Sequence, residues 1–343
     1  MNAIRLLPHV FLVALRTAIS TAIPTAISAA IAAILGFASI PASAQTYPNK
    51  PITLIVPFAA GGPSDAHMRQ FGAALSRQLK QSIIIENVGG GAGNIGPARV
   101  ARANADGYTI MQHNLGFATA PALYKNLEYN PVTDFDYLGT LVFDPSLLMA
   151  RSDFPTNNFK EFIAYVKANQ EKITIGISGP SHLSALLFME ATGTKLTTVP
   201  YKGGGPAMND LVAKHIDLLS NSASIVGPLI RSGKVKAIGV TGKQRVANLP
   251  EVPTLDEQGL TGFEMVVWTS IFAPKNLPGA VRDRLVAGLQ GTLTDTELVA
   301  HFNRTGGQIA TREQATPSAL QALVRSEVEK WGRVLKNAGV QPE

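Results

Sequence analysis

Residues 52–65 read ITLIVPFAAGGPSD, an apolar, β-rich run that ends in a glycine-rich turn and leads into a helix-like stretch. The same order recurs at three further turns: residues 89–96 (GGGAGNIG), 178–181 (SGPS) and 202–206 (KGGGP). A helix start exposes free backbone N–H groups at the positive end of the helix dipole. Because such a start binds anions readily, the repeated pattern predicts a protein that holds a small anion.

Strand-like and helix-like segments alternate along most of the chain. The first set has strands at 52–56, 83–85 and 108–111 and helices at 67–79 and 95–103. The second set has helices at 159–168, 182–191, 207–213 and 225–231, and strands at 173–177, 197–199, 216–219 and 235–240. This alternation predicts an α/β protein whose parallel strands are joined by right-handed crossovers.

Two extended stretches are candidate crossings between two α/β domains. Residues 137–149, broken at Asp144-Pro145, lead out of the first set, and residues 263–272 follow the second. The last segment has helices near 280–291 and at 317–337, has no strand of its own, and is expected to pack on the first unit. We therefore predict a discontinuous domain 1 of residues 46–146 plus 266–343 and a domain 2 of residues 147–265.

Residues 1–44 have the pattern of a cleavable signal peptide. Arg5 and Arg16 are the only charged residues, an uncharged stretch follows, and Ala42-Ser43-Ala44 forms a small-residue exit. A transmembrane anchor is the alternative, because the uncharged stretch is long enough to span a bilayer. We favour cleavage and export to the periplasm, since prolines and hydroxylated residues weaken a span. Cleavage lowers the formal net charge from +6 to +4.

Composition argues against several classes of function. There is no cysteine, which rules out disulfides, thiolate metal sites and a cysteine nucleophile. The six histidines are scattered without carboxylates at metal-ligand spacing, so neither a metal nor another cofactor is expected. Lysine and arginine are dispersed without an aromatic platform, so nucleic acid is not an expected partner.

Residues 91–96 match the G-x-G-x-x-G pattern of dinucleotide-binding proteins. That fingerprint requires an acidic residue about 20 positions later, at the end of the next strand. Here the strand ends at Gln112-His113-Asn114. We therefore favour close helix packing and a ligand-facing loop over a nucleotide site.

Residues 176–180 approach the G-x-S-x-G elbow of hydrolases, but Pro180 stands where glycine is required. The side chains available for a triad are Ser64, Asp65, His67, Ser178, Ser181 and His182, and no spacing enforces one. We favour helix capping by the serines and Asp65. No catalytic residue is therefore predicted, and a secreted hydrolase remains the minor alternative.

Two helix starts are needed to hold an anion at useful affinity. A hydrogen bond to a charged group contributes roughly 1.5 to 3 kcal/mol, whereas micromolar binding needs about 8 kcal/mol after the cost of association. One helix start from each domain would meet this demand. We therefore expect a cleft between the domains that closes on its ligand.

Several segments resemble one family in combination. They are YPNKPI at 47–52 and IVPFAAGGPSD at 55–65; EN at 86–87 before GNIG at 93–96; DGYT at 106–109; PALYKNL at 121–127 with PVTDF at 131–135; VPYKG at 199–203; GKVKA at 233–237; LPEVPT at 249–254; and WG at 331–332. This combination resembles the substrate-binding proteins of tripartite tricarboxylate transporters, the Bug-type receptors. The likeness covers essentially the whole chain after residue 44.

The resemblance implies a type II periplasmic binding fold, with two α/β domains, two crossover strands and a ligand cleft between the domains. It implies a monomeric receptor that holds a small organic acid and delivers it to integral-membrane permease subunits, or alternatively reports it to a membrane sensor. Carried over residue by residue, it implies ligand contacts at Phe58, Ala60, Gly61, Ser64, Asp65, Asn94, Ile95, Ser178, Ser181, His182, Tyr201, Lys202 and Gly203. For Asp65, a ligand contact and a helix cap are equally weighted.

Three departures from the family pattern concern the wall of domain 2. The loop before His182 is about two residues shorter, Leu186 replaces a glutamate, and Ser220-Asn221-Ser222 replaces Phe-Asp-Asn. Loss of acidic groups there suits a more anionic or more apolar ligand than an amino acid. The sequence alone identifies no particular acid.

Overall fold

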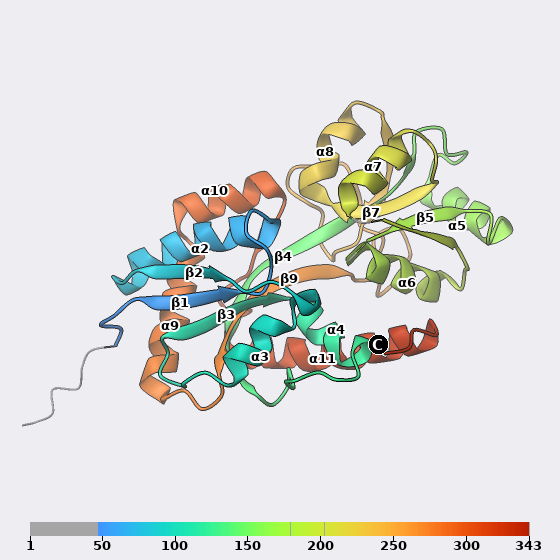
Figure 1. Ribbon diagram of the computed structural model, residues 1–343. Helices are drawn as coiled ribbons and strands as arrows, with labels where there is room; N and C mark the ends of the chain where they lie inside the picture. Colours follow the sequence, from blue (N-terminus) through green and yellow to red (C-terminus); the bar gives the residue numbers. More distant parts are fainter. Residues whose placement is uncertain (1–46, 179, 202, 343) are drawn as a thin grey trace, which may run out of the picture. The chain divides into compact units, whose positions relative to one another are not determined.

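A computed structural model describes residues 47–178, 180–201 and 203–342 (Figure 1). The predicted signal peptide and Lys202 lie outside the described residues. Within the described part of the chain, no helix is long and apolar enough to cross a membrane. The elements are β1 (Ile52–Val56), α2 (Pro63–Leu79), β2 (Ile83–Asn87), the 3-10 helix η1 (Gly91–Gly93), α3 (Ile95–Ala101), β3 (Thr109–Asn114), α4 (Gly116–Leu123), β4 (Phe135–Arg151), α5 (Phe159–Ala168), β5 (Thr174–Ile177), α6 (Pro180–Thr192), β6 (Thr197–Pro200), α7 (Gly204–Val212), β7 (Leu218–Ser222), α8 (Ala223–Arg231), β8 (Val235–Val240), β9 (Val266–Pro274), α9 (Gly279–Thr292), α10 (Thr296–Thr305), β10 (Gln308–Ile309) and α11 (Pro317–Asn337).

The strands form one curled sheet in the order β2-β1-β3-β9-β4-β7-β5-β6, and β8 and β10 also pair with β4. Strand β1 is parallel to β2 and β3, and β5 is parallel to β6 and β7. Parallel pairing is thus confirmed for the predicted first set and for three strands of the second, whereas the fourth, β8, pairs antiparallel with β4. The strands β7, β8, β9 and β10 run antiparallel to β4, which belongs to both halves of the sheet.

The predicted break at Asp144-Pro145 is wrong, because β4 continues through it. Pro145 pairs in register with Val266 of β9, and the next residue, Ser146, pairs with Ser222 of β7. A proline lacks an N–H group, so it fits where the strand changes partners. The chain returns through Thr241, whose hydroxyl accepts a hydrogen bond from the Ser146 N–H at 2.9 Å. The crossing predicted at residues 137–149 is therefore present in β4.

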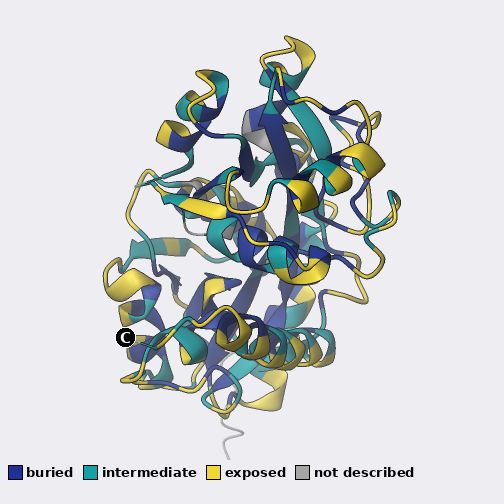
Figure 2. Ribbon diagram, turned by 90° about the vertical axis from the view of Figure 1, so that its right-hand side faces the viewer, coloured by how far each residue is buried: buried dark blue, intermediate teal, exposed yellow. Residues whose placement is uncertain are grey.

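Helices cover both faces of each half of the sheet (Figure 1). In the first half, α2, α9 and α10 share one buried apolar cluster with the strands, and α3, α4 and α11 share another. In the second half, α7 and α8 pack on one side and α5 and α6 on the other. Buried residues follow the strands and the inner helix faces (Figure 2). This arrangement leaves the carboxyl ends of the parallel strands uncovered.

The C-terminal segment packs on the first half, as predicted, with Trp331 of α11 fully buried in the cluster that contains Phe117 of α4. The expectation that this segment lacks a strand is wrong, because β10 pairs with β4. Helices α4 and α10 were also not predicted. Pro121 lies inside α4 and disguised it, since proline in a helix interior normally ends the helix.

The glycine-rich stretch at 91–96 serves close packing, as favoured above. A Cβ atom on Gly96 would lie 2.7 Å from the Cβ of Pro57, so only glycine lets α3 approach the end of β1 this closely. Gly93 has a φ of +94°, and a Cβ there would lie 3.2 Å from the Phe58 ring. Glycine is thus required at both positions by packing and backbone conformation.

Candidate functional site

A cavity of about 640 Å³ lies where the carboxyl ends of both parallel strand sets meet. Five of its lining residues stand at or just beyond such an end, in β1, β3, β5, β6 and β7 respectively: Phe58, Asn114, Ser178, Tyr201 and Ser222. Ligands of open α/β sheets bind at this place in the fold. The volume is within the range of small-molecule sites.

Helix starts from both halves of the sheet border the cavity. Gly62 is the N-cap of α2, Gly203 is the N-cap of α7, and both line the cavity. Neither cap supplies a side-chain hydrogen bond to its helix. Pro63, the first residue of α2, has no N–H, so the donors left uncapped by side chains are the backbone N–H groups of Ser64 and Asp65 in α2 and of Gly204 and Gly205 in α7.

Two serine hydroxyls add donor capacity to the same cavity. Among the described residues, the hydroxyls of Ser64 and Ser178 have no hydrogen-bond partner, although both residues line the cavity. The predicted capping by Ser178 is not what the structure shows. Instead the hydroxyl of Ser181 accepts the Ser178 N–H at 2.7 Å and donates to the Ser178 carbonyl at 3.0 Å. Ser181 thereby braces the loop that presents Ser178.

Asp65 holds the turn before α2. It is 4% exposed, and its Oδ2 accepts hydrogen bonds from the Gly61 N–H at 2.9 Å and from Arg69 Nε at 3.0 Å. The Gly61 N–H and then the Arg69 guanidinium lower the pKa of this carboxyl below its ordinary value. Asp65, Gly61 and Ala60 adjoin the cavity in sequence but do not line it. The geometry thus gives Asp65 a bracing role within its own turn.

The two central strands contribute residues that sequence reasoning did not assign to the site. Val142, Asp144 and Ser146 alternate along β4, so they share one face. Val267 pairs in register with Asp144, and Thr269 pairs with Val142. Burial raises the pKa of Asp144 to about 6, although a hydrogen bond from Ser222 works against the shift. The cavity therefore contains an acidic group that is costly to ionise.

Two ionisable rings in the lining carry no charge at neutral pH. His67 lies with its ring centroid 5.1 Å from those of His301 and Phe302, and burial lowers its pKa to about 4. Tyr201 donates its hydroxyl to Asp210 Oδ2 at 2.6 Å, and burial together with that carboxylate raises its pKa to about 12. Both rings contribute apolar surface rather than charge.

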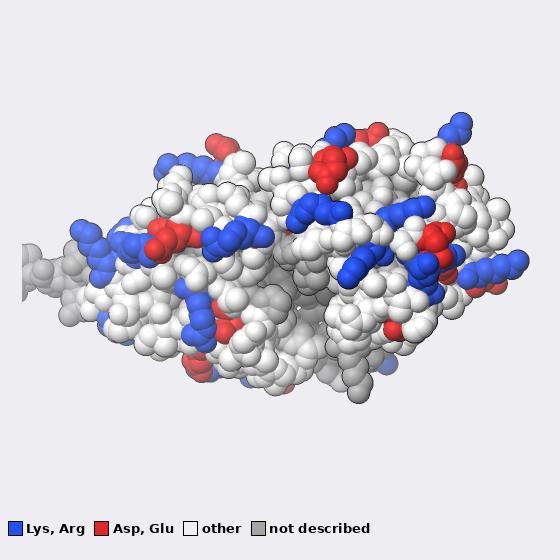
Figure 3. Space-filling view, turned by 90° about the horizontal axis from the view of Figure 1, so that it is seen from above, with Lys and Arg blue, Asp and Glu red and all other residues white. Residues whose placement is uncertain are grey.

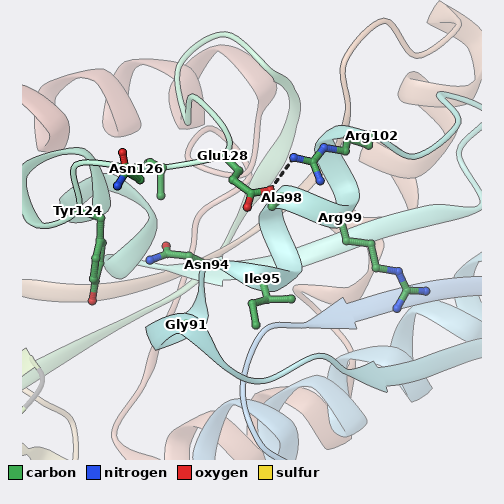
Figure 4. A pocket seen from close by; sticks show the side chains of 10 residues that line it. Gly91, Asn94, Ile95, Ala98, Arg99, Arg102, Tyr124, Asn126 and Glu128 are labelled. Atoms are coloured by element: carbon green, nitrogen blue, oxygen red, sulfur yellow. Dashed lines mark hydrogen bonds and ion pairs between the residues drawn. The ribbon is translucent and has the colours of Figure 1, made fainter. Parts of the chain in front are cut away.

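Three other predicted contacts lie elsewhere. Asn94 and Ile95 line a second cavity of about 400 Å³ beside α3, together with Tyr124 (Figure 4). The Asn94 Oδ1 accepts the Tyr129 hydroxyl at 2.8 Å. His182 is half-buried on α6 and does not line the first cavity, and burial lowers its pKa. Of the predicted contacts, Phe58, Ser64, Ser178, Ser181, Tyr201 and Gly203 are brought together in the first cavity.

The lining of the cavity and the surface of the protein differ in how many charged side chains they carry. The described lining of the cavity includes one carboxylate, Asp144, and neither lysine nor arginine. On the face shown in Figure 3, basic and acidic side chains are interspersed around a central hollow. Within the described lining, an anion would therefore meet neutral donors and a single acid.

Comparison with known proteins adds to this geometry. The model of the tripartite tricarboxylate transporter family receptor matches residues 67–340. The chain belongs to this family. Members of the family are periplasmic solute-binding receptors. The resemblance stated from the sequence is therefore confirmed.

Solved structures similar to this receptor share its fold. The periplasmic binding protein BugD is 43% identical, with a TM-score of 0.70 over 87% of this chain and 100% of that one. MatC from Rhodopseudomonas palustris, solved with bound malate, is 34% identical, with a TM-score of 0.69 over 84% and 100%. An R. palustris protein solved with adipate is 30% identical, with a TM-score of 0.71 over 87% and 100%. The predicted two-domain type II periplasmic binding fold is thus confirmed.

Proposed function

We propose that this receptor is exported, captures a small carboxylate in the cavity at the strand ends, and delivers it to the permease subunits of a tripartite transporter. The observation that carries the proposal is the pair of helix starts, α2 and α7, that border the cavity without side-chain caps. Malate and adipate in the related structures are both carboxylates, which supports the same ligand class here.

Neutral donors suit this task because they hold an anion without burying an unpaired cation when the site is empty. The candidate contacts are Phe58, Ser64, Ser178, Ser181, Tyr201 and Gly203. Two helix starts and two free hydroxyls offer several hydrogen bonds of roughly 1.5 to 3 kcal/mol each to a carboxylate. The summed free energy of these hydrogen bonds is sufficient for micromolar affinity after the cost of association.

We further propose that residues 1–44 are a signal peptide and that the protein is a monomer without catalytic activity. Its two domains have the bounds predicted above. The alternative within the same class is a receptor that reports its ligand to a membrane sensor. Transport of the ligand by cells that lack this protein would favour the sensor. Loss of that transport would favour the permease.

A thermal-shift screen of the purified protein tests the proposed ligand class. The screen uses mono-, di- and tricarboxylates, amino acids and aromatic acids, each with its uncharged amide as a control. We expect saturable stabilisation by an acid and none by its amide, amounting to about 2.7 kcal/mol at a ligand concentration of 100 times Kd. If no acid stabilises the protein, or if an acid is converted to product, the proposal fails.

Crowding the start of α7 should weaken ligand binding. A Cβ on Gly204 would lie 2.8 Å from the Nδ2 of Asn221, which also lines the cavity, so one of the two must move. We expect Gly204→Ala to weaken binding of the acid found in the screen by roughly tenfold, equivalent to one lost hydrogen bond. Gly205→Ala is the matched control, because a Cβ there meets nothing within 4 Å. Equal affinities of the two variants would contradict a binding role for this helix start.

A further inference from the structure

The described protein groups around the Asp144 carboxyl do not satisfy all of its hydrogen-bond acceptor sites. Its Oδ1 and Oδ2 both lie near the Ser222 hydroxyl, at 3.1 and 3.4 Å. A hydroxyl has one proton to donate, whereas a carboxylate has about four acceptor sites. The described residues give Asp144 no other hydrogen bond. Most of its acceptor capacity is therefore left for whatever occupies the cavity that it lines.

No described cation balances this acid. The register neighbour on β9 is Val267, and β10 places Gln308 opposite the adjacent Phe143. In the turn that follows β8, Lys243 pairs with Asp256 at 3.3 Å and Arg245 pairs with Glu257 at 2.9 Å. On the helices that border the cavity, His67 of α2 is neutral, and the Tyr201 hydroxyl before α7 is bonded to Asp210. Among the described residues, Asp144 thus has no counter-ion.

We propose that Asp144 is a specificity-determining residue that selects acids carrying a hydrogen-bond donor, either a hydroxyl or an ammonium group, on the carbon chain beside the carboxylate. This inference rests on the proposed function. A donor satisfies the free oxygens of Asp144, whereas a plain methylene leaves them unpaired and a further carboxylate opposes them with like charge. This proposal departs from the expectation of a more anionic or more apolar ligand.

Matched ligand series test the proposal by calorimetry at pH 8. The series are succinate, malate and aspartate; glutarate, 2-hydroxyglutarate and glutamate; and phenylpropionate, phenyllactate and phenylalanine. Within each series only the group beside the carboxylate changes. In a series that binds, we expect the hydroxyl or the ammonium member to bind roughly tenfold tighter than the donor-free member. Which of the two is preferred distinguishes a hydroxy acid from an amino acid.

The variant Asp144→Asn should reduce that preference to within roughly threefold, because it removes the charge that a donor-free acid leaves unpaired. Asp153→Asn is the control, because Asp153 pairs with Arg151 and Lys214 away from the cavity. Protonation removes the charge of Asp144, so the preference in the wild type should also decline as the pH falls through about 6. In Asp144→Asn it should not change with pH.

Two different results distinguish a failure of the role proposed for Asp144 from a failure of the proposed receptor function. A donor-free acid that binds as tightly as its hydroxy and amino analogues, or a preference that survives in Asp144→Asn, overturns the role of Asp144 and leaves the receptor function intact. An absence of binding by every acid in the three series and in the wider screen overturns the proposed function itself. Thermal unfolding of both variants confirms that each is folded before affinities are compared.

Discussion

Replacing Asp144 by asparagine is expected to raise the free energy of unfolding of the unliganded protein by about 1–3 kcal/mol at pH 8, and by a clearly smaller amount at pH 4.5. The reason is that burial raises the pKa of this carboxyl to about 6 in the folded protein. The folded state therefore binds more protons than the unfolded state between the ordinary pKa of aspartate and pH 6. Stability must then fall as the pH rises through that window, and the full penalty is present above pH 6.

Asparagine is neutral at every pH and still accepts the Ser222 hydroxyl, so it removes the penalty without changing the size of the side chain. Urea unfolding of the wild type and the variant from pH 4.5 to 8 measures the difference directly. Asp153→Asn controls for a general change in net charge. A difference that stays constant across this range would show that the folded protein does not penalise the charge of Asp144. Stabilisation of the empty protein together with loss of ligand selectivity would mark Asp144 as a residue kept for function.

Local sequence patterns were sufficient to predict most elements of the fold. The bounds predicted for residues 52–56 and 159–168 are those of β1 and α5, because each segment has a clear period and clear ends. The family resemblance, carried over residue by residue, was enough to assign Phe58, Ser178 and Tyr201 to one cavity. The alternation of strands and helices already indicated two α/β domains, and the family resemblance added the type II periplasmic binding fold.

The contribution of β4 to the cavity was not predictable in this way. The proline after Asp144 signalled a break, whereas the strand continues by changing partners. Which face of β4 lines the cavity depends on its register with β9, whose residues lie more than 100 positions away in the sequence. A shift of one residue would have turned Asp144 to the opposite face. Asn94 likewise depends on tertiary structure, because its place follows from the close approach of α3 to Pro57.

The second large effect that we expect is a loss of stability in acid caused by His113. The ring is fully enclosed, with Phe58 and Phe117 at centroid distances of 5.6 and 5.2 Å. Its Nδ1 accepts the Asn114 N–H at 2.8 Å, so the neutral ring carries its proton on Nε2, 3.3 Å from the Gly93 carbonyl. Protonation would place a second ring proton on Nδ1, where its N–H would face the Asn114 N–H. Burial lowers the pKa of His113 to about 4.

The unfolded state takes up a proton at an ordinary histidine pKa near 6.5, while the folded state does not until about pH 4. Between these values the unfolded state binds more protons, so we expect about 3 kcal/mol of stability to be lost as the pH falls from 6.5 to 4. In the lower part of this window, protonation of Asp144 offsets part of the loss, so the slope is clearest in the Asp144→Asn background. Denaturant unfolding at a series of pH values measures it.

His113→Gln separates the proton effect from packing. The variant loses the ring contacts and should be less stable at pH 8, yet its stability should depend less steeply on pH than that of the wild type. His215→Gln, a substitution at an exposed histidine on the other half of the sheet, should leave the slope unchanged. If the slope persists in His113→Gln, the acid sensitivity belongs to another buried group, and His67 is the next to test because burial also lowers its pKa to about 4. His67 lines the cavity, and His113 lies against Phe58 of the same lining, so an effect of either histidine ties acid stability to the wall of the cavity.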